Sequence, residues 1–223
     1  MQKFDTPAPV TAVLDIPAGR VQLIAADRAD TAVEVLPLNP AKSRDAKAAE
    51  QVTVEYGDGV LRVAAPEAKS RVLGSSGSVE VTVQLPAGSR VEARTAAAEL
   101  RGVGRLGDVD FEGAQGPVKI DEAAHVRLAV HDGSVEIGRL NGPAEITADR
   151  GDLTVTEAVR GTVTLRTHQG SISVGAARGV SASLDAGTSY GRVSNALKNS
   201  AGADAELAFH ATTDQGDITA RSL

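Results

Sequence analysis

Short runs of alternating apolar and polar residues dominate this chain, and in its second half they recur in phase with glycine. Each copy begins with Gly, continues with a small or polar residue, and then alternates apolar with polar positions. The copies are Gly116–Ile120, Gly133–Ile137, Gly151–Val155, Gly170–Val174 and Gly216–Ala220, with a degenerate copy at Gly191–Asn195. The glycines follow one another at steps of 17, 18, 19, 21 and 25 residues. Such self-similarity indicates a repeat protein.

A second alternating run lies between successive glycine copies, so each repeat predicts two short strands. These runs are Val126–Val130, Ala144–Ala148, Val163–Thr167, Ser181–Asp185 and Leu207–Ala211. A period of two is typical of strands, and none of these segments has a helical pattern. The pattern therefore predicts an all-β fold whose C-terminal half is a repetitive β-solenoid-like (β-helix-like) structure. A β-sandwich with hairpins at similar spacing is the alternative.

The inward-facing residues of these strands are expected to stack as ladders, because each repeat buries too little apolar surface alone. Two columns are predicted, with the repeats stacked in chain order. They are Val118, Val135, Leu153, Ile172, Val193 and Ile218 in one column, and Ile120, Ile137, Val155 and Val174 in the next.

The first hundred residues also read as strands, but with irregular spacing. Pro17–Gly19 and Pro86–Gly88 are matching turns, and Tyr56–Gly59 is a hairpin signal of the Asp-Gly kind. The segment 40–51 is polar and Ala-rich, which predicts a loop or a short surface helix, and Arg71–Ser78 reads as a loop. We therefore predict an irregular β N-terminal capping region over residues 1–100 and β-solenoid repeats over 101–223.

Several of these segments together resemble the bacterial putative-adhesin family of unknown function, also described as the Toastrack domain. The resemblance lies in Leu14–Gly19 followed by a strand, in Val54–Leu61, and in the recurring strand starts of Gly-Asp or Gly-Ser type. It covers nearly the whole chain and implies a β-solenoid-like fold. In some members it also implies an association with envelope-stress systems. It supplies no catalytic residues and no cofactor.

Composition narrows the function classes. The chain has 223 residues, a net charge of -6, 2% aromatic residues, no Cys and no Trp. Nucleic acid is an unexpected partner, since no stripe of Lys and Arg is present and few aromatic faces exist for stacking bases. No apolar stretch is long enough to be a transmembrane segment and the start has no signal-peptide pattern, so the expected location is cytoplasmic.

Three short motifs in the chain have structural explanations. Gly102–Gly107 matches G-x-G-x-x-G, but a strand pattern and no helix follows it. Gly74–Ser78 lacks the lysine of a phosphate-binding loop. Arg150–Asp152 spells a cell-adhesion tripeptide, yet it coincides with a repeat turn. No cofactor is therefore predicted.

One polar column carries candidate chemistry. Two residues before successive turn glycines lie His131, Asp149 and His168. If the repeats stack at the usual strand spacing of about 4.8 Å, these three form a His-Asp-His ladder at one corner. Imidazole and carboxylate are ligands for zinc and related ions, so the ladder is a candidate metal site. The alternative is that short polar side chains at a corner satisfy turn amides.

These patterns favour a non-enzymatic structural scaffold or protein-binding module. The sequence ends within the strand Gly216–Leu223, which predicts an open edge there that pairs with a second copy as a homodimer or filament. The alternative is that Arg221 and the polar segment Asn195–Glu206 protect this edge. A metal- or small-ligand-binding protein using the His131/Asp149/His168 corner is the second hypothesis. A polysaccharide-active β-helix enzyme is the third, although acidic residues such as Glu136, Glu145, Asp152 and Asp217 are spread over strand exteriors and turns.

Overall fold

The computed structural model describes residues 1–66 and 77–223. Two compact units divide the chain, Met1–Gly116 and Pro117–Leu223, and each is described by itself below. The predicted boundary near residue 100 falls inside a strand of the first unit. Most of the predicted loop Arg71–Ser78, including the start of its Gly-Ser motif, lies outside the described residues.

The first unit contains seven strands and one helix in its described residues. They are β1 (Gln2–Asp5), β2 (Thr11–Ala26), β3 (Asp30–Pro37), α1 (Ser43–Gln51), β4 (Thr53–Gly57), β5 (Val60–Ala64), β6 (Val79–Pro86) and β7 (Arg90–Gln115). Of the two alternatives predicted for 40–51, a loop or a short surface helix, the structure has the helix, α1. The predicted hairpin at 56–59 is also confirmed, since β4 and β5 pair antiparallel and Asp58 and Gly59 adopt positive φ at its turn.

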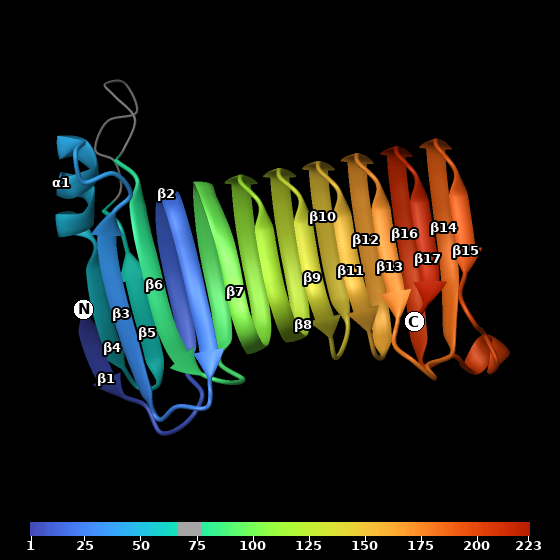
Figure 1. Cartoon of the computed structure of the whole chain (residues 1–223), viewed down its shortest axis with the longest axis horizontal. Helices are drawn as coiled ribbons and strands as arrows, with labels where there is room; N and C mark the ends of the chain where they lie inside the picture. The colour runs from blue at the N-terminus through green and yellow to red at the C-terminus, as the bar shows by residue number, and fades with distance from the viewer. Residues whose placement is uncertain (67–76) are drawn as a thin grey trace. The chain divides into compact units, whose positions relative to one another are not determined.

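Parallel coiling is already present in this first unit. The first half of β2 pairs in parallel with β5, and its second half pairs in parallel with β6. On its other side nearly the whole of β2 pairs in parallel with the first part of β7, from Arg90 to Gly104. Strand β2 therefore forms a full coil between a β5–β6 coil and the start of β7, as Figure 1 shows. Antiparallel strands β1, β3 and β4 and the helix α1 add the irregular part of this unit.

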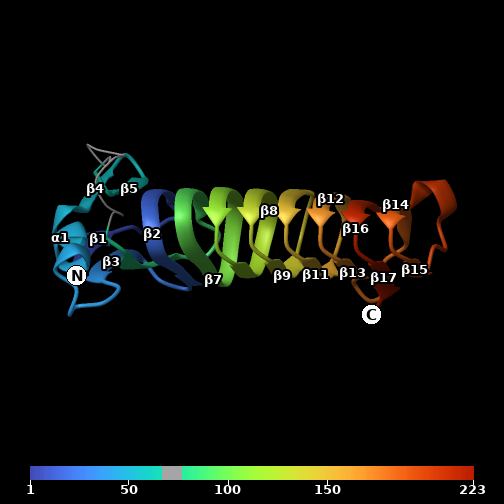
Figure 2. The same ribbon diagram turned by 90° about the horizontal axis from the view of Figure 1, so that it is seen from above.

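The second unit is a β-solenoid of two-stranded coils, here called rungs, and the predicted fold class is confirmed. Its elements are β8 (Val118–Asp132), β9 (Val135–Leu140), β10 (Ala144–Arg150), β11 (Leu153–Ala158), β12 (Gly161–Gln169), β13 (Ile172–Ala176), β14 (Ala182–Tyr190), β15 (Val193–Ala196), the 3-10 turn η1 (Gly202–Asp204), β16 (Leu207–Gln215) and β17 (Ile218–Ser222). One parallel face is formed by the second part of β8, from Val126 onward, with β10, β12, β16 and β14. The other is formed by the first part of β8 with β9, β11, β13, β17 and β15 (Figure 2).

The rungs do not stack in chain order. Strand β16 pairs with β12 on one side and with β14 on the other, and β17 lies in the same way between β13 and β15. In Figure 1 the red pair β16–β17 accordingly lies inside the orange pair β14–β15. The expected open edge at Gly216–Leu223 is therefore wrong, because both sides of β17 are already paired. The outermost rung of the described unit is β14–β15.

Burial of the apolar column follows this interleaved order. Ile172 and Ile218 are 1% and 0% exposed, whereas Val193 in the outermost rung is 46% exposed. The second predicted column is buried throughout its length, at Ile120, Ile137, Val155 and Val174. A residue with an apolar neighbour on each side is covered twice, and Val193 is covered only once.

The close contacts of the turn glycines also follow the interleaved order of the rungs. A Cβ at Gly170 would collide with the carbonyl of Gly151, one at Gly216 with the carbonyl of Gly170, and one at Gly191 with the carbonyl of Gly216. All three glycines have strongly positive φ, which L side chains rarely adopt. Glycine is therefore required at this corner both by backbone conformation and by the close approach of the next rung.

Candidate functional site

The outermost rung of the second unit combines an unpaired backbone with exposed apolar side chains. Among the described residues, β14 pairs with β16 and β15 pairs with β17, and neither has a strand partner on its outer side. Only the start of β14 is covered, where Ala182 N–H donates to the carbonyl of Lys198 at 3.1 Å. In the part of the chain that the structure describes, the other outward-facing N–H and C=O groups of this edge have no strand partner and are available to another chain.

The side chains of this rung differ from those of the internal rungs. Val193 and Tyr190 are 46% and 76% exposed, and Leu184 is half-buried although it occupies an inward position. Asp185 is the single charged residue of β14, and β15 has none. Edge strands are commonly protected by charged side chains, Lys above all, and this edge has little such protection.

Side-chain hydrogen bonds hold the outermost rung to the inserted one. Thr188 Oγ1 donates to the carbonyl of Gly216 at 3.0 Å, and Asp217 Oδ1 accepts from the N–H of Arg192 at 2.9 Å. An equivalent bond, from Thr213 Oγ1 to the carbonyl of Gly170 at 2.9 Å, holds the inserted rung to its other neighbour. The same kinds of hydrogen bond at each turn therefore fix the register of the outermost rung, so its edge is an ordered surface rather than a frayed end.

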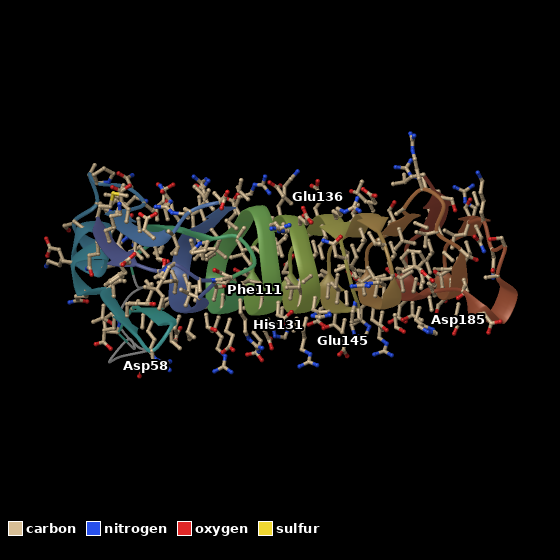
Figure 3. All side chains as sticks on the ribbon, turned by 90° about the horizontal axis from the view of Figure 1, so that it is seen from below. Asp58, Phe111, His131, Glu136, Glu145 and Asp185 are labelled. Atoms are coloured by element: carbon tan, nitrogen blue, oxygen red, sulfur yellow. The ribbon has the colours of Figure 1, made fainter. Side chains whose placement is uncertain are left out.

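The predicted polar ladder forms on one exterior face of the second unit, and it is longer than predicted. His131 Nδ1 lies 2.7 Å from Asp149 Oδ2, and His168 Nδ1 lies 2.8 Å from Asp214 Oδ2. His168 Nε2 is 4.0 Å from Asp149 Oδ1, so the ladder alternates His, Asp, His and Asp along four strands. Figure 3 shows His131 on the same face as Glu145 and Asp185, with Glu136 on the opposite face.

Asp214 belongs to this ladder only because the rungs interleave. In chain order the neighbour of His168 would be Ser189 of β14, whereas the structure places Asp214 of β16 there. On the other side of the inserted rung, His210 Nδ1 lies 3.4 Å from Asp185 Oδ2 on β14. Ion pairs thus flank both sides of the inserted rung.

These contacts shift two pKa values. The hydrogen bond to Asp214 and the charges of Asp214 and Asp149 raise the pKa of His168 above its ordinary value. The hydrogen bond from His131, with smaller contributions from nearby charges, lowers the pKa of Asp149. All four ladder side chains are largely exposed, so the interactions are screened by water.

The side chains of the ladder contact one another in His-Asp pairs, and they do not converge on a single point where a metal ion could be bound. Within the described parts of the chain, no group of three His, Cys, Asp or Glu side chains is arranged to hold a metal ion. The residues His131, Asp149 and His168 are therefore brought side by side as expected, while metal binding by them stays a prediction. A calorimetric titration with Zn²⁺ at neutral pH tests it.

The short motifs have structural roles. Arg150 forms an ion pair with Asp132 at 3.0 Å, Gly151 adopts the positive φ of the turn, and Asp152 Oδ1 accepts from the N–H of Ser171 at 2.8 Å. Each residue of the adhesion-type tripeptide is thus used within the fold. The segment 102–107 lies inside β7, and strand continues after it.

The first unit has a charged groove that the sequence reasoning missed. It has a volume of about 420 Å³, and its lining residues are Val13, Leu14, Asp15, Arg90, Glu92, Ala93, Arg94, Asp110 and Glu112. Arg90 pairs with Glu92 at 3.0 Å and Arg94 with Glu112 at 3.3 Å. The signal was present as charges at 90, 92 and 94 that recur at 108, 110 and 112, one coil later. A polysaccharide-active enzyme stays a hypothesis, although no aromatic side chain lines this groove for a sugar ring.

Among the described residues, no helix is long and apolar enough to cross a membrane. This finding bears on helices alone.

Comparison with known proteins agrees on the fold. A family model described as Toastrack DUF4097 matches residues 11–221. A crystal structure described as a putative adhesin from Bacteroides fragilis is similar, with a TM-score of 0.62, 13% identity, and coverage of 98% of this chain and 95% of that one. A putative cell adhesion protein from Clostridium sporogenes has a TM-score of 0.45 at 14% identity, covering 100% and 98% of the two chains. At these identities the likeness to solved structures concerns the fold alone. No curated protein matches the chain.

Proposed function

Since the chain belongs to the Toastrack DUF4097 family, we propose that it is a non-enzymatic binding module that uses its outermost rung β14–β15 to pair with another protein. The observation that carries the proposal is the half-paired rung itself. Its outer backbone groups have no strand partner among the described residues, and Val193 and Tyr190 lie exposed beside them. Addition of a strand to such an edge is a common mode of peptide and protein recognition.

A second copy of the chain is the first candidate partner. Two identical edges can pair around a two-fold axis, and closed two-fold dimers are the commonest homo-oligomers. Pairing of β14 and β15 with their counterparts would give the outward-facing N–H and C=O groups partners and would cover Val193. With one charge in the two strands, Asp185, the repulsion between two copies is small. An association with envelope stress stays a prediction from the family resemblance.

Light scattering behind size exclusion, over a wide concentration range, tests this proposal. We expect the full chain to self-associate as concentration rises, and we expect Val193→Lys to remain monomeric because it places a charge on the edge. Leu36→Lys is the matched control, since Leu36 in the first unit has the same 46% exposure as Val193. Circular dichroism checks that both variants keep the β fold.

Two outcomes would overturn the proposal. One is a wild-type chain that stays monomeric at every concentration. The other is an oligomer that Val193→Lys leaves as stable as Leu36→Lys does. In either case β14–β15 is not the self-association surface, and the groove of the first unit becomes the next candidate for binding.

A further inference from the structure

The inserted rung β16–β17 occupies a slot between two rungs that precede it in the chain. Its strands pair with β12 and β13 on one side and with β14 and β15 on the other. Its inward side chains are completely buried, at Leu207, Phe209, Ala211, Ile218 and Ala220. In a solenoid, stability comes largely from interfaces between neighbouring rungs. This rung makes two such interfaces, one on each side.

The segment that joins the inserted rung to β15 is polar and exposed. Residues 198–202 are exposed, and the segment contains the short turn η1. Polar contacts near it include Lys198 N–H to Ser222 Oγ at 2.9 Å and Ala201 N–H to Ser181 Oγ at 3.0 Å. No apolar side chain of this segment is buried among the described residues. The covalent link therefore adds little to the contacts that hold the rung in its slot.

Folding in chain order leaves the slot to be filled last. The rungs β12–β13 and β14–β15 are complete in sequence before Leu207, so β16–β17 has to enter between them. A rung from another copy makes the same hydrogen bonds, apolar contacts and ion pairs, because the two chains are identical. The attached rung competes only through its effective concentration, which is in the mM range for short flexible linkers. High protein concentration during folding therefore favours a rung from a neighbour.

We propose that the slot between β12–β13 and β14–β15 is an intermolecular site that takes the rung Leu207–Ser222 of a second copy. Two copies that exchange this rung reciprocally form a dimer in which each slot is filled, while one-way exchange builds a chain of copies. This inference is independent of the proposed edge pairing, since exchange buries β16–β17 between chains and leaves β14–β15 as the outermost rung of each slot.

Cross-linking between single-cysteine chains tests the exchange, because the natural chain has no Cys. Ser173 of β13 and Thr219 of β17 are direct register partners on the outer face. Full chains with Ser173→Cys and full chains with Thr219→Cys are mixed in denaturant, refolded together at rising concentration, and treated with a short thiol cross-linker. We expect a covalent mixed dimer on a non-reducing gel, in a yield that rises with concentration.

The matched control uses the other neighbour of Ser173. Thr154 of β11 is its register partner on the opposite side, and both belong to rungs that the exchange does not separate. Chains with Thr154→Cys mixed with Ser173→Cys chains are therefore expected to give no mixed dimer. A single chain with both Ser173→Cys and Thr219→Cys shows that the spacing allows cross-linking.

The outcomes decide the proposal. Mixed dimers from the 173 and 219 pair, with none from the 173 and 154 pair, support exchange of the last rung. Cross-linking confined to the double-cysteine chain overturns it, since the rung then stays in its own slot. Equal yields from both mixtures also overturn it, because the chains then associate without a specific exchange. Repeating the mixture with Val193→Lys in both chains checks for edge pairing, since a mixed dimer that forms despite a charge on the edge comes from exchange.

Discussion

Interleaving of the last two rungs makes a quantitative prediction about four buried or half-buried side chains of one column. Ile172 and Ile218 are neighbours in this column and are both fully buried, while Val135 is 1% and Val193 46% exposed. In a stack that follows chain order, β16–β17 would be outermost, Ile218 would be exposed and Val193 would be covered on both sides. Alanine substitutions at these positions therefore distinguish the two orders.

The magnitudes follow from burial. Truncation of a fully buried Ile to Ala costs about 2–5 kcal/mol, so Ile172→Ala and Ile218→Ala are expected to lower the free energy of unfolding by similar amounts. Val→Ala removes two carbons worth about 0.8 kcal/mol each when buried, and more where a cavity remains. With nearly half of its surface in water, Val193→Ala is expected to cost about 1 kcal/mol or less, and Val135→Ala clearly more.

Equilibrium unfolding in urea, monitored by circular dichroism and fitted with one m-value for all variants, measures these differences in the free energy of unfolding. Because solenoid rungs can open separately, hydrogen exchange of peptides from 207–222 gives a local reading of the same effect. Ile172 is internal in both orders and so calibrates the cost of Ile→Ala in this column. The reasoning is refuted if Ile218→Ala costs far less than Ile172→Ala while Val193→Ala costs as much as Val135→Ala.

Two further predictions concern the turn glycines and the polar ladder. Gly170→Ala is expected to lower the urea midpoint strongly, because the added Cβ would collide with the carbonyl of Gly151 and because Gly170 has a positive φ. The control Gly187→Ala, with open space around its Cβ, should leave the midpoint nearly unchanged or higher. Equal effects of the two substitutions would contradict the corner geometry. The raised pKa of His168 means that its ion pair with Asp214 stabilises the fold fully below the unfolded value of 6.5 and loses this contribution as pH rises through the folded value. The urea midpoint at pH 5.5, taken relative to that at pH 8.5, should therefore be lower in His168→Gln than in the natural chain, and an unchanged relative midpoint would show that the pair contributes nothing.

Much of the fold was predictable because its physics is local and periodic. Alternation of apolar and polar residues predicts the strands, and the recurring glycine predicts the corner where consecutive rungs approach. The columns from Val118 to Ile172 and from Ile120 to Val174 follow directly, since each residue stacks on its counterpart in the next copy. The adjacency of His131, Asp149 and His168 was predictable for the same reason, because these three lie in rungs that do stack in chain order.

The spatial order of the last rungs was harder to predict from the sequence. A repeat period indicates which residues share a column, but it does not indicate the order in which they stack within that column. The groove of the first unit was missed for a related reason. Its two charged triplets lie one coil apart, but the irregular spacing of the first hundred residues hides this period. Both features depend on which coils become neighbours in space, which a search for repeats does not determine.

Competition between the two candidate rungs explains why interleaving is favoured, and the apolar residues of the two rungs show which of them gains more from an internal place. The rung β16–β17 presents Leu207, Phe209 and Ile218 to the core, whereas β14–β15 presents Ala182, Leu184 and Val193. An internal rung buries both sides and an outermost rung only one, so placing the larger apolar side chains inside removes more apolar surface from water. Insertion also pairs His168 with Asp214, whereas chain order would place Ser189 beside both of these residues. The contact between His210 and Asp185 forms in either order, because β14 and β16 are neighbours in both. The same preference leaves the smaller and less apolar rung at the surface, and it is this rung whose unpaired edge is available to a partner.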